Sequence, residues 1–267
     1  MSLRDATYHE ILEHKILGKE ESIDLASKVK LLKLIKKGFL NINGVISTGK
    51  NSVVLHGTKY SNLEKPKECV IKVFKITNKK QDKYFKIDHE CNDGISKRMW
   101  RTPAHLEMNK MLHLKKIGLN CPDVVILNKR IILMTYMRGK KLSDLKLLSL
   151  NDWSGTYYEV IDVMQKMFRE GRLVHANLSE RKILWWEKKC WFIDMSHSVD
   201  ADHPNALALL LRDCHSILNF FKRKKVPGVN VMSAEDLLHY ISGNDGSWRL
   251  AQTDVSNIIT YNKIPQL

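Results

Sequence analysis

Two segments in the second half of the chain decide the fold: Leu173–Leu184, which reads LVHANLSERKIL, and Trp191–Asp200, which reads WFIDMSHSVD. Both combine apolar residues, typical of short buried strands, with polar residues at fixed positions. The first contains Asn177 and Lys182, and the second contains Asp194, 17 positions after Asn177. A carboxylate directly after a buried strand is well placed to hold Mg²⁺ on nucleotide phosphates. The two segments together therefore predict a site that handles phosphate groups.

A turn in the first half carries further candidates for phosphate binding. It reads STGKNS and lies between two predicted strands. Its small residues let backbone N–H groups approach phosphate oxygens, and its lysine adds positive charge. The turn is too short for a Walker A motif, and glycine-containing turns of this kind are common on their own. Its candidate residues are Ser47, Thr48, Gly49, Lys50 and Ser52.

A later segment, Glu68–Lys75, reads ECVIKVFK, overlaps the predicted strand Cys69–Ile76 and places Lys72 among apolar neighbours. In a kinase, a lysine at such a position contacts the α- and β-phosphates of ATP. The alternative is an ordinary strand lysine that points outward to solvent. Without the other segments, the second interpretation is favoured.

The composition describes a basic globular protein. Its 267 residues form one large domain or two small lobes, enough to bury a core without disulfide or metal support. Hydrophobic residues make up 43% and charged residues 27%, which excludes a disordered tail, a collagen-like chain and a coiled-coil rod. The 44 Lys and Arg against 29 Asp and Glu give a net charge of +15. This excess indicates a polyanionic partner, such as RNA, DNA, nucleotide phosphate or an anionic membrane face, unless it serves solubility alone.

The sequence indicates a protein of the cytosol or nucleus. Its longest apolar runs fall far short of the ~18 residues that a membrane-spanning helix needs. Its polar start, MSLRDATYHE, is unlike a secretory signal. The five cysteines form no CxxC pair, which favours reduced thiols over disulfides or a structural zinc site. We therefore expect a cytoplasmic location and no membrane partner.

The hydrophobic periodicity divides the chain into a β-rich first half and an α-rich second half. A basic amphipathic helix over Ser22–Lys37, closed by Gly38, precedes an antiparallel meander. The predicted strands are Ile42–Ser47, Val53–His56, Cys69–Ile76, Val124–Leu127 and Ile131–Met137, with further short strands within Leu173–Met195. The later helices are Ala104–Lys116, Trp153–Glu170, Ala206–Lys222 and Ser233–Ser242, and Lys79–Lys97 is a predicted loop.

This order of elements predicts an α+β, bilobal, protein-kinase-like fold with a β-rich N-lobe and an α-helical C-lobe. The predicted parts are residues 1–40 as an N-terminal basic helical segment, 41–138 as the N-lobe, 139–250 as the C-lobe and 251–267 as a C-terminal tail. Element order alone does not single out one fold family, so the motifs have to do so.

Six motifs, in this order, resemble the RIO family of atypical serine/threonine protein kinases, and their details are most similar to the third RIO subfamily. They are STGKNS, CVIKVFK, LNCPDVVIL, LVHANLSERKIL, FIDMSHSVDADHPNAL and LLRDCHSILNFF. The family's catalytic loop reads HADLSEYN, and its metal motif reads IDVSQSV followed by HP. The resemblance extends from about Leu31 to Gly243 and so covers most of the chain.

The resemblance implies ATP as the ligand and Mg²⁺ as the cofactor. Ser47–Ser52 would form the phosphate loop, and Lys72 would contact the phosphates. The backbone from Thr135 to Met137 would form the hinge that binds adenine. Asp194 would be the metal-binding aspartate, which in RIO enzymes can also accept the phosphate.

Three positions depart from the family pattern. Asn177 replaces the aspartate that serves as catalytic base, and because an amide takes no proton at neutral pH, general-base help worth about 10²–10⁴ in rate is lost. Lys182 replaces the metal-binding asparagine, and its ammonium would compete with Mg²⁺ by pairing with Asp194. The glutamate that tethers the strand lysine falls on Ala104, and Glu107 would replace it only if the helix rotates or shifts.

These departures favour a pseudokinase, or a very weak ATPase or kinase, that binds ATP or ADP with reduced dependence on Mg²⁺. Two alternatives remain: an active atypical serine/threonine protein kinase or ATPase, and a non-enzymatic signalling scaffold with a protein partner. The resemblance also implies association with pre-40S ribosomal particles. Three basic stretches are candidate RNA surfaces, and each could equally be a lysine face that binds nothing: Lys28–Lys37, Lys59–Lys86 and Lys222–Lys225.

Overall fold

The computed structural model describes residues 23–61, 65–76, 102–145, 150–226 and 229–243. The predicted loop Lys79–Lys97, the segment before residue 23 and the tail 251–267 lie outside these residues. The chain separates into two compact units. The N-terminal unit consists of Met1–Leu112 and Pro122–Tyr136, and the C-terminal unit consists of His113–Cys121 and Met137–Leu267.

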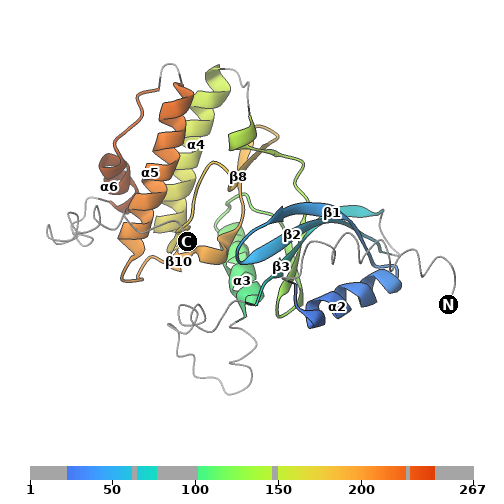
Figure 1. Cartoon of the computed structure of the whole chain (residues 1–267). Helices are drawn as coiled ribbons and strands as arrows, with labels where there is room; N and C mark the ends of the chain where they lie inside the picture. Colours follow the sequence, from blue (N-terminus) through green and yellow to red (C-terminus); the bar gives the residue numbers. More distant parts are fainter. Residues whose placement is uncertain (1–22, 62–64, 77–101, 146–149, 227–228, 244–267) are drawn as a thin grey trace. The chain divides into compact units, whose positions relative to one another are not determined.

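The N-terminal unit is built on a five-stranded antiparallel sheet in the order β1-β2-β3-β5-β4 (Figure 1). Its strands are β1 (Leu40–Thr48), β2 (Ser52–Lys59), β3 (Lys67–Phe74), β4 (Val124–Asn128) and β5 (Ile131–Thr135). Strands β1 to β3 form the predicted antiparallel meander, which is confirmed. In β2, Val53, Leu55 and Gly57 are buried while the residues between them are not, the period-2 pattern of a strand with one face in the core.

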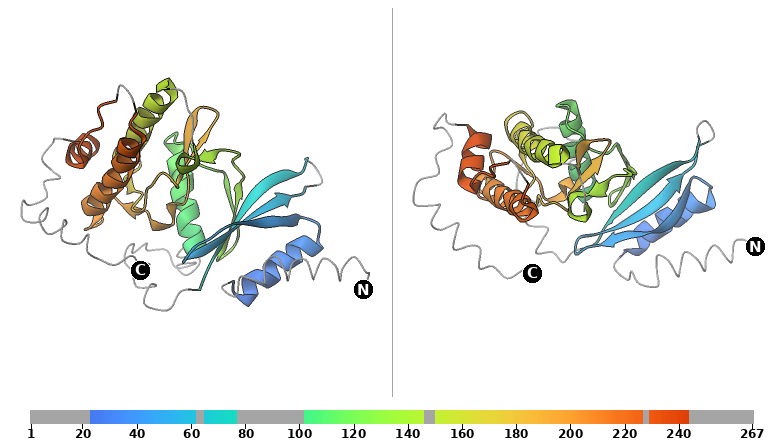
Figure 2. Two further views of the ribbon diagram at one scale, coloured as in Figure 1. Left: turned by 45° about the horizontal axis from the view of Figure 1, so that its top comes forward. Right: turned by 90° about the horizontal axis from the view of Figure 1, so that it is seen from above.

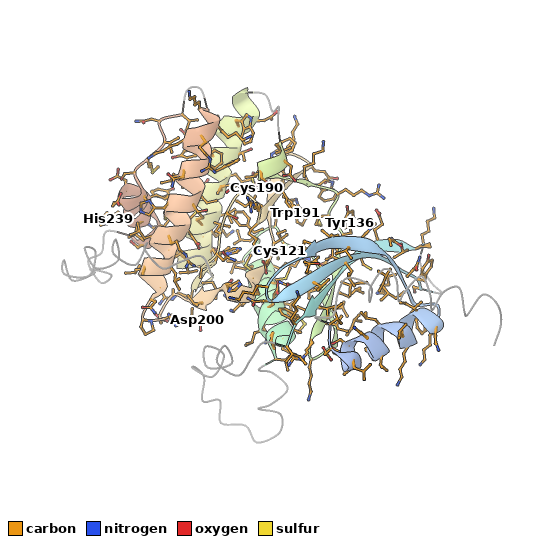
Figure 3. All side chains as sticks on the ribbon, viewed as in Figure 1. Cys121, Tyr136, Cys190, Trp191, Asp200 and His239 are labelled. Carbon is orange, nitrogen blue, oxygen red and sulfur yellow. The ribbon has the colours of Figure 1, made fainter. Side chains whose placement is uncertain are left out.

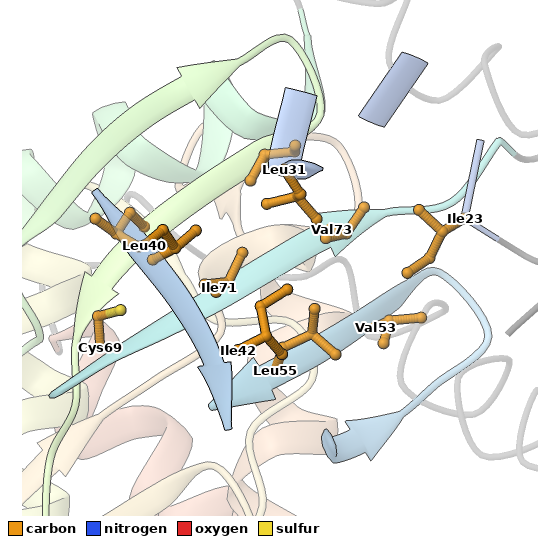
Figure 4. Packing of buried hydrophobic residues seen from close by; sticks show 11 residues of the cluster. Ile23, Leu31, Leu40, Ile42, Val53, Leu55, Cys69, Ile71 and Val73 are labelled. Atoms are coloured by element: carbon orange, nitrogen blue, oxygen red, sulfur yellow. The ribbon is translucent and has the colours of Figure 1, made fainter. Parts of the chain in front are cut away.

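Helix α2 (Leu25–Lys36) packs against one face of this sheet (Figure 4). It begins three residues later than predicted because the Asp24 carboxylate accepts the Ser27 N–H and caps the helix. Gly38, at φ 73°, follows its end as predicted. The shared core contains Ile23, Leu31, Leu40, Ile42, Val53, Leu55, Cys69, Ile71, Val73, Ile131 and Leu133.

Helix α3 (Pro103–Lys116) has nearly the predicted bounds. Pro103 opens it, which suits the first helical position because the N–H that proline lacks would have no partner there. Gly118, at φ 77°, follows its end. The boundary between the two units falls inside this helix, after Leu112.

The C-terminal unit is mainly helical. Helices α4 (Leu150–Arg169) and α5 (Ala206–Lys224) lie side by side, and α6 (Ala234–Ser242) packs against both (Figure 1, Figure 2). Ser233, at the predicted start of this helix, caps α6 by accepting the Asp236 N–H. One small sheet contains β6 (Lys140–Lys141), β8 (Ile183–Trp186) and β9 (Lys189–Phe192), and β7 (Leu173–Val174) pairs with β10 (Val199–Asp200).

The four cysteines within the described residues are buried free thiols: Cys69, Cys121, Cys190 and Cys214. Figure 3 shows Cys121 and Cys190 inside the C-terminal unit. Burial raises the pKa of the Cys121 thiol to about 11, so this cysteine is unreactive at neutral pH. Among the described helices, none combines the length and the apolar character that crossing a membrane requires.

Candidate functional site

The turn between β1 and β2 holds the residues predicted to bind phosphate. Ser47 and Thr48 end β1, and Ser52 begins β2. The Gly49 N–H donates to the Ser52 carbonyl at 2.9 Å, which closes the turn. Ser47, Thr48, Gly49 and Lys50 are all exposed. The turn therefore presents small side chains, backbone groups and one ammonium to solvent, which is chemistry that suits an anion.

Lys72 lies in the middle of β3, where Val54 of β2 and Ile132 of β5 are its cross-strand neighbours. Its Nζ atom donates to both carboxylate oxygens of Glu107, at 2.9 and 2.7 Å. Lys72 is 3% exposed and Glu107 is 1% exposed. Two charges this deeply buried are tolerated only when they satisfy each other. Lys72 is therefore held in place by α3, and the alternative of an outward-facing strand lysine is wrong.

The expectation that Lys72 has lost its helix partner is also wrong. Ala104 is fully buried and packs against two hydrophobic residues of the sheet. Glu107 stands one turn further along the same side of α3 and reaches Lys72 from there. The motif comparison misplaces the glutamate because Pro103 sets where the helix begins, and the pairing residue lies one turn further into it.

The predicted hinge residues lie where β5 ends. The Thr135 N–H donates to the Asp123 carbonyl at 3.0 Å, and the Tyr136 N–H donates to the Glu68 carbonyl at 3.4 Å. Met137 is 8% exposed, and its N–H has no hydrogen-bond partner among the described residues. Of these three N–H groups, only that of Met137 has no acceptor among the described residues. Adenine binding at this position stays a prediction.

The loop that contains Asn177 is fixed by Asp213 of α5. The Asp213 carboxylate accepts the N–H groups of Ala176 at 2.7 Å and of Leu178 at 2.8 Å, and Arg212 donates to the Ala176 carbonyl. Ala176 has a left-handed backbone, φ 60°, which a residue with a Cβ adopts only where its surroundings impose it. The Asn177 side chain is exposed on this loop. The backbone of the predicted catalytic loop is therefore held by α5, and position 177 carries an amide.

His175 precedes this loop and is 2% exposed. Its Nε2 atom lies 3.3 Å from the Ile193 carbonyl, and its buried Nδ1 atom has no partner among the described residues. Burial lowers the pKa of His175 to about 3, so the ring is neutral at pH 7 and Nε2–H is the donor. A neutral buried ring fits the expected structural role, bracing the loop rather than binding a metal.

Lys182 and Asp194 form an ion pair in the C-terminal unit, as the sequence predicts. The backbone brings them together, because the Lys182 carbonyl accepts the Ile193 N–H at 3.0 Å. Lys182 contacts the Oδ2 atom of Asp194, and the Ser196 hydroxyl donates to Oδ1 at 2.7 Å. The two side chains of the pair are 25% and 22% exposed. Both carboxylate oxygens of Asp194 are therefore engaged by neighbours within the unit.

The surroundings of Asp194 do not fit a Mg²⁺ site. Mg²⁺ takes oxygen ligands in octahedral geometry, usually one or two carboxylates beside substrate phosphates and water. Asp194 supplies one carboxylate, which is already paired, and Lys182, at the position where the resemblance implies a metal-binding asparagine, brings an ammonium, which has no lone pair. In the part of the chain that the structure describes, no three His, Cys, Asp or Glu side chains are grouped as a metal site.

Exposed lysines gather on the N-terminal unit: Lys33, Lys36, Lys37, Lys59, Lys65 and Lys67. Residues 79–86 of the second predicted basic stretch lie outside the described residues. The C-terminal run Lys222–Lys225 is partly occupied, because Arg223 contacts Glu180 at 3.4 Å and Lys224 donates to the Leu145 carbonyl at 2.9 Å. Of the three predicted basic stretches, the two in the N-terminal unit therefore contribute the larger number of exposed lysines.

Two contacts of the site are not apparent from the sequence motifs. The first is the hydrogen bond that the Ser196 hydroxyl donates to the Asp194 carboxylate. A serine two residues after an aspartate could have indicated it, because this spacing favours local side-chain hydrogen bonds. The second is the pair of hydrogen bonds that the Asp213 carboxylate accepts from two backbone N–H groups. The donors lie 37 and 35 positions before Asp213 in the sequence. The motif LLRDCHSILNFF contains Arg212 and Asp213 but does not indicate which loop they hold.

Comparison with known proteins gives a consistent set of relatives. The family model of the RIO domain matches residues 53–235. The serine/threonine-protein kinase RIO3 of Mus musculus is 36% identical over 263 residues, which are 90% of this chain and 49% of that protein. The serine/threonine-protein kinase RIO1 of Homo sapiens is 30% identical over 241 residues, 84% of this chain and 40% of that protein. The chain spans about half the length of the curated relatives it matches.

Two solved structures of Rio2 kinase from Chaetomium thermophilum share the fold. The ADP/Mg²⁺-phosphoaspartate complex has a TM-score of 0.54 and 20% identity, and the match covers 82% of this chain and 66% of that one. A further crystal structure of the enzyme has a TM-score of 0.51 and 17% identity, with 98% and 96% covered. The predicted α+β, kinase-like fold, with a β-sheet N-terminal unit and a helical C-terminal unit, is confirmed.

Proposed function

Since this chain belongs to the RIO family of atypical serine/threonine protein kinases, we propose that it binds ATP or ADP as a pseudokinase or a very weak ATPase or kinase. The RIO3 and RIO1 relatives are named serine/threonine-protein kinases, and the similar Rio2 structure is a complex with ADP and Mg²⁺. The two units of this chain support the two halves of the proposal separately. The N-terminal unit supports nucleotide binding, and the C-terminal unit supports slow turnover.

Nucleotide binding is supported by a cation that is already held in position. Lys72 is desolvated and fixed by Glu107, so it loses little side-chain entropy when its ammonium meets a phosphate. The exposed turn Ser47–Ser52 adds Lys50 and backbone N–H groups for further phosphate oxygens. The end of β5 at Thr135 is the proposed start of the hinge that binds adenine.

The ion pair between Lys182 and Asp194 is the observation that carries slow turnover. A bound Mg²⁺ ion would supply two positive charges and orient the transferring phosphoryl group. Lys182 supplies one charge and no ligand, and it engages the carboxylate that would otherwise hold the metal or accept a phosphate. Asn177 can orient a hydroxyl or a water, but it cannot take its proton.

Calorimetric titration with ATP, in Mg²⁺ and in EDTA, tests this proposal. The wild type should bind ATP weakly and similarly under both conditions. Lys182→Asn removes the competing ammonium and should make binding depend on Mg²⁺, whereas the matched Lys182→Arg keeps a cation and should not. Lys72→Met should weaken binding under both conditions. Tight, strictly Mg²⁺-dependent binding by the wild type would contradict the proposal.

Two other results would select the alternatives. Turnover by the wild type at about 1–100 s⁻¹, the range of protein kinases, would establish an active enzyme in place of a pseudokinase. No detectable ATP or ADP binding would leave a non-enzymatic scaffold that works through a protein partner.

We also propose that the exposed lysines of the N-terminal unit bind RNA, as on a cytoplasmic pre-40S ribosomal particle. The support is the group of exposed lysines from Lys33 to Lys37 and from Lys59 to Lys67. The run Lys222–Lys225 contributes less because half of it is engaged within the C-terminal unit. Binding should weaken steeply with salt, because each phosphate contact releases counterions. An affinity for RNA that does not change between low and moderate salt would remove this function.

A further inference from the structure

A shallow pocket in the N-terminal unit has a lining that suits a nucleobase. It has a volume of about 220 Å³ and lies where the end of α2 meets the start of β1 and the chain just after β2. Its lining residues are Ile35, Gly38, Leu40, Asn41 and Tyr60, and we call it the Tyr60 pocket. An aromatic ring and aliphatic side chains suit the face of a base.

A second exposed aromatic residue lies next to Tyr60. The Tyr60 N–H donates to the Phe39 carbonyl at 3.0 Å, so the two residues face each other across neighbouring segments. Phe39 is 48% exposed and Tyr60 is 40% exposed. Neighbouring exposed rings are the arrangement on which proteins stack successive bases of a single strand.

Lysines lie on both sides of these rings. Lys36 and Lys37 directly precede Gly38 at the end of α2, and Lys59 directly precedes Tyr60. Lys67 is the cross-strand partner of Lys59. All four lysines are exposed.

The opposed lysines of β2 and β3 are on the sheet face that α2 covers. Because side chains alternate between the two faces of a strand, Lys59 is on the same face as the buried residues Leu55 and Gly57, and Lys67 is on the same face as Cys69. In Figure 4, Leu40 and Cys69 lie at one end of the core cluster and Ile23 lies at the other, so these lysines and the end of α2 share one end of the unit.

We infer that the Tyr60 pocket, with Phe39 and these four lysines, is a docking surface for single-stranded RNA. A base enters the pocket and stacks on Tyr60, a second base stacks on Phe39, and the lysines contact the phosphates. This inference rests on the proposed RNA binding of the N-terminal unit and narrows it to one surface and one form of RNA.

The chemistry of the surface favours a single strand over two other anionic partners. A duplex keeps its bases stacked inside and offers no base face to an aromatic ring. A membrane surface is bound by a long apolar helix face flanked by basic residues, whereas this surface is a small pocket between a helix end and two strands.

Fluorescence anisotropy with a labelled, unstructured RNA of about twelve nucleotides tests the inference, beside a duplex of equal length. The wild type should prefer the single strand. Tyr60→Ser should weaken single-strand binding by about tenfold or more, and Tyr60→Phe should retain it, because stacking needs the ring and not the hydroxyl. Lys36→Gln with Lys59→Gln should lower the slope of log affinity against log salt by about 1.4, since each contact contributes about 0.7 on single strands.

Matched controls come from the C-terminal unit. Tyr240 of α6 is 43% exposed, close to the exposure of Tyr60, so Tyr240→Ser removes an equivalent ring elsewhere and should not change RNA binding. Lys188→Gln with Lys189→Gln removes the same charge as the first lysine pair, at two exposed positions outside the predicted basic stretches, and should leave the salt slope unchanged. ATP titration of Tyr60→Ser should match the wild type, which shows that the fold and the nucleotide residues are intact.

The outcomes separate this inference from the function on which it rests. If the wild type binds RNA and Tyr60→Ser binds it equally well, the pocket is not the docking surface, although RNA binding stands. If the wild type binds no RNA, the RNA function itself fails, while nucleotide binding is judged by calorimetry alone. If Tyr60→Ser loses binding to phosphatidylserine vesicles and keeps binding to RNA, the surface is a membrane contact and the inference is overturned.

Discussion

Among the described residues, each unit of this protein contains a lysine–carboxylate ion pair at its predicted site residues, and these two pairs differ in burial. The side chains of Lys72 and Glu107 are 4% and 0% exposed, whereas those of Lys182 and Asp194 are 25% and 22% exposed. The first pair joins the central strand of a sheet to a helix. A buried pair is costly to break, whereas a pair that water reaches contributes little to stability.

This difference shows where a kinase-like fold can change without losing its structure. The N-terminal unit keeps its lysine–glutamate pair because that pair is part of the core. The C-terminal unit keeps its buried scaffold, in which the Asp213 carboxylate accepts the Ala176 N–H. It departs from the family pattern at Asn177 and Lys182, whose side chains are exposed or partly exposed to solvent. The departures in chemistry thus lie at positions where a substitution costs least stability.

Restoring the reactive side chains of the C-terminal unit should give the largest effect. Asn177→Asp supplies a general base, and Lys182→Asn frees Asp194 and supplies an oxygen ligand. The double variant should hydrolyse ATP in Mg²⁺ about 10²–10⁴ faster than the wild type. Its free energy of unfolding should change by less than about 1 kcal/mol, because the pair that is lost is partly exposed. Single-turnover ATPase assays and urea unfolding measure the two quantities.

The matched control is Asn177→Gln with Lys182→Asn, which frees Asp194 without supplying a base and should remain slow. If the first double variant gains nothing, the N-terminal unit is not competent either. The contrast between an intact and an altered unit would then be lost.

Breaking the buried pair should give the second largest effect, on stability. Glu107→Ala leaves the Lys72 ammonium buried and unpaired, and should lower the free energy of unfolding by about 3–5 kcal/mol. Replacing both partners, Lys72→Met with Glu107→Leu, removes both charges and should restore most of that loss. Urea unfolding of the three proteins measures the difference. A Glu107→Ala variant as stable as the wild type would mean that burial does not distinguish the two pairs.

Local patterns in the sequence predicted most elements of both units, because they depend on neighbours along the chain. Gly38 and Gly118 follow helix ends at positive φ, where a residue without a Cβ is favoured. Ser233 marks the start of α6 for an equally local reason, since its hydroxyl accepts a backbone N–H three residues on. The pairing of Lys182 with Asp194 was also predictable, because family motifs fix both positions.

The partner of Lys72 was not predictable from the motifs. Lys72 and Glu107 are 35 residues apart, and their contact depends on which turn of α3 lies opposite the middle of β3. A motif comparison that is wrong by one helical turn changes the partner from a glutamate to an alanine. The environment of Lys224 was missed for the same reason, because a run of basic letters does not show which side chain packs against α4.

The buried groups of the C-terminal unit should make its stability depend on pH. The folded pKa of His175 is about 3, below its usual 6.5, so its contribution is fully present above about pH 6.5 and is lost as the pH falls toward 3. The folded pKa of Asp213 is about 6, above its usual 3.8, because of burial, so its contribution is lost as the pH rises through 6. Between about pH 4 and 6 the two oppose each other.

His175→Phe separates these contributions because the new ring keeps the volume and does not titrate. The stability of the wild type relative to this variant should fall by about 1 kcal/mol per pH unit below pH 6.5. Urea unfolding of both proteins between pH 4 and 7.5 measures it. Parallel profiles would mean that His175 is not buried as a neutral ring.

The smallest effect tests the same burial rule on the run Lys222–Lys225. The Nζ atom of Lys224 donates to the Leu145 carbonyl at 2.9 Å and lies 5.1 Å from the centroid of the Trp153 ring. Lys224→Gln should therefore cost about 1–2 kcal/mol through the lost hydrogen bond and cation–π contact, whereas Lys222→Gln, at an exposed position of the same helix, should stay within about 0.5 kcal/mol. Thermal unfolding compares the two variants, at about 2–4 °C per kcal/mol. Equal melting temperatures would show that the Lys224 ammonium is solvated like that of Lys222. Lys224 would then be available to RNA phosphates, whereas its contacts with Leu145 and Trp153 engage it within the unit.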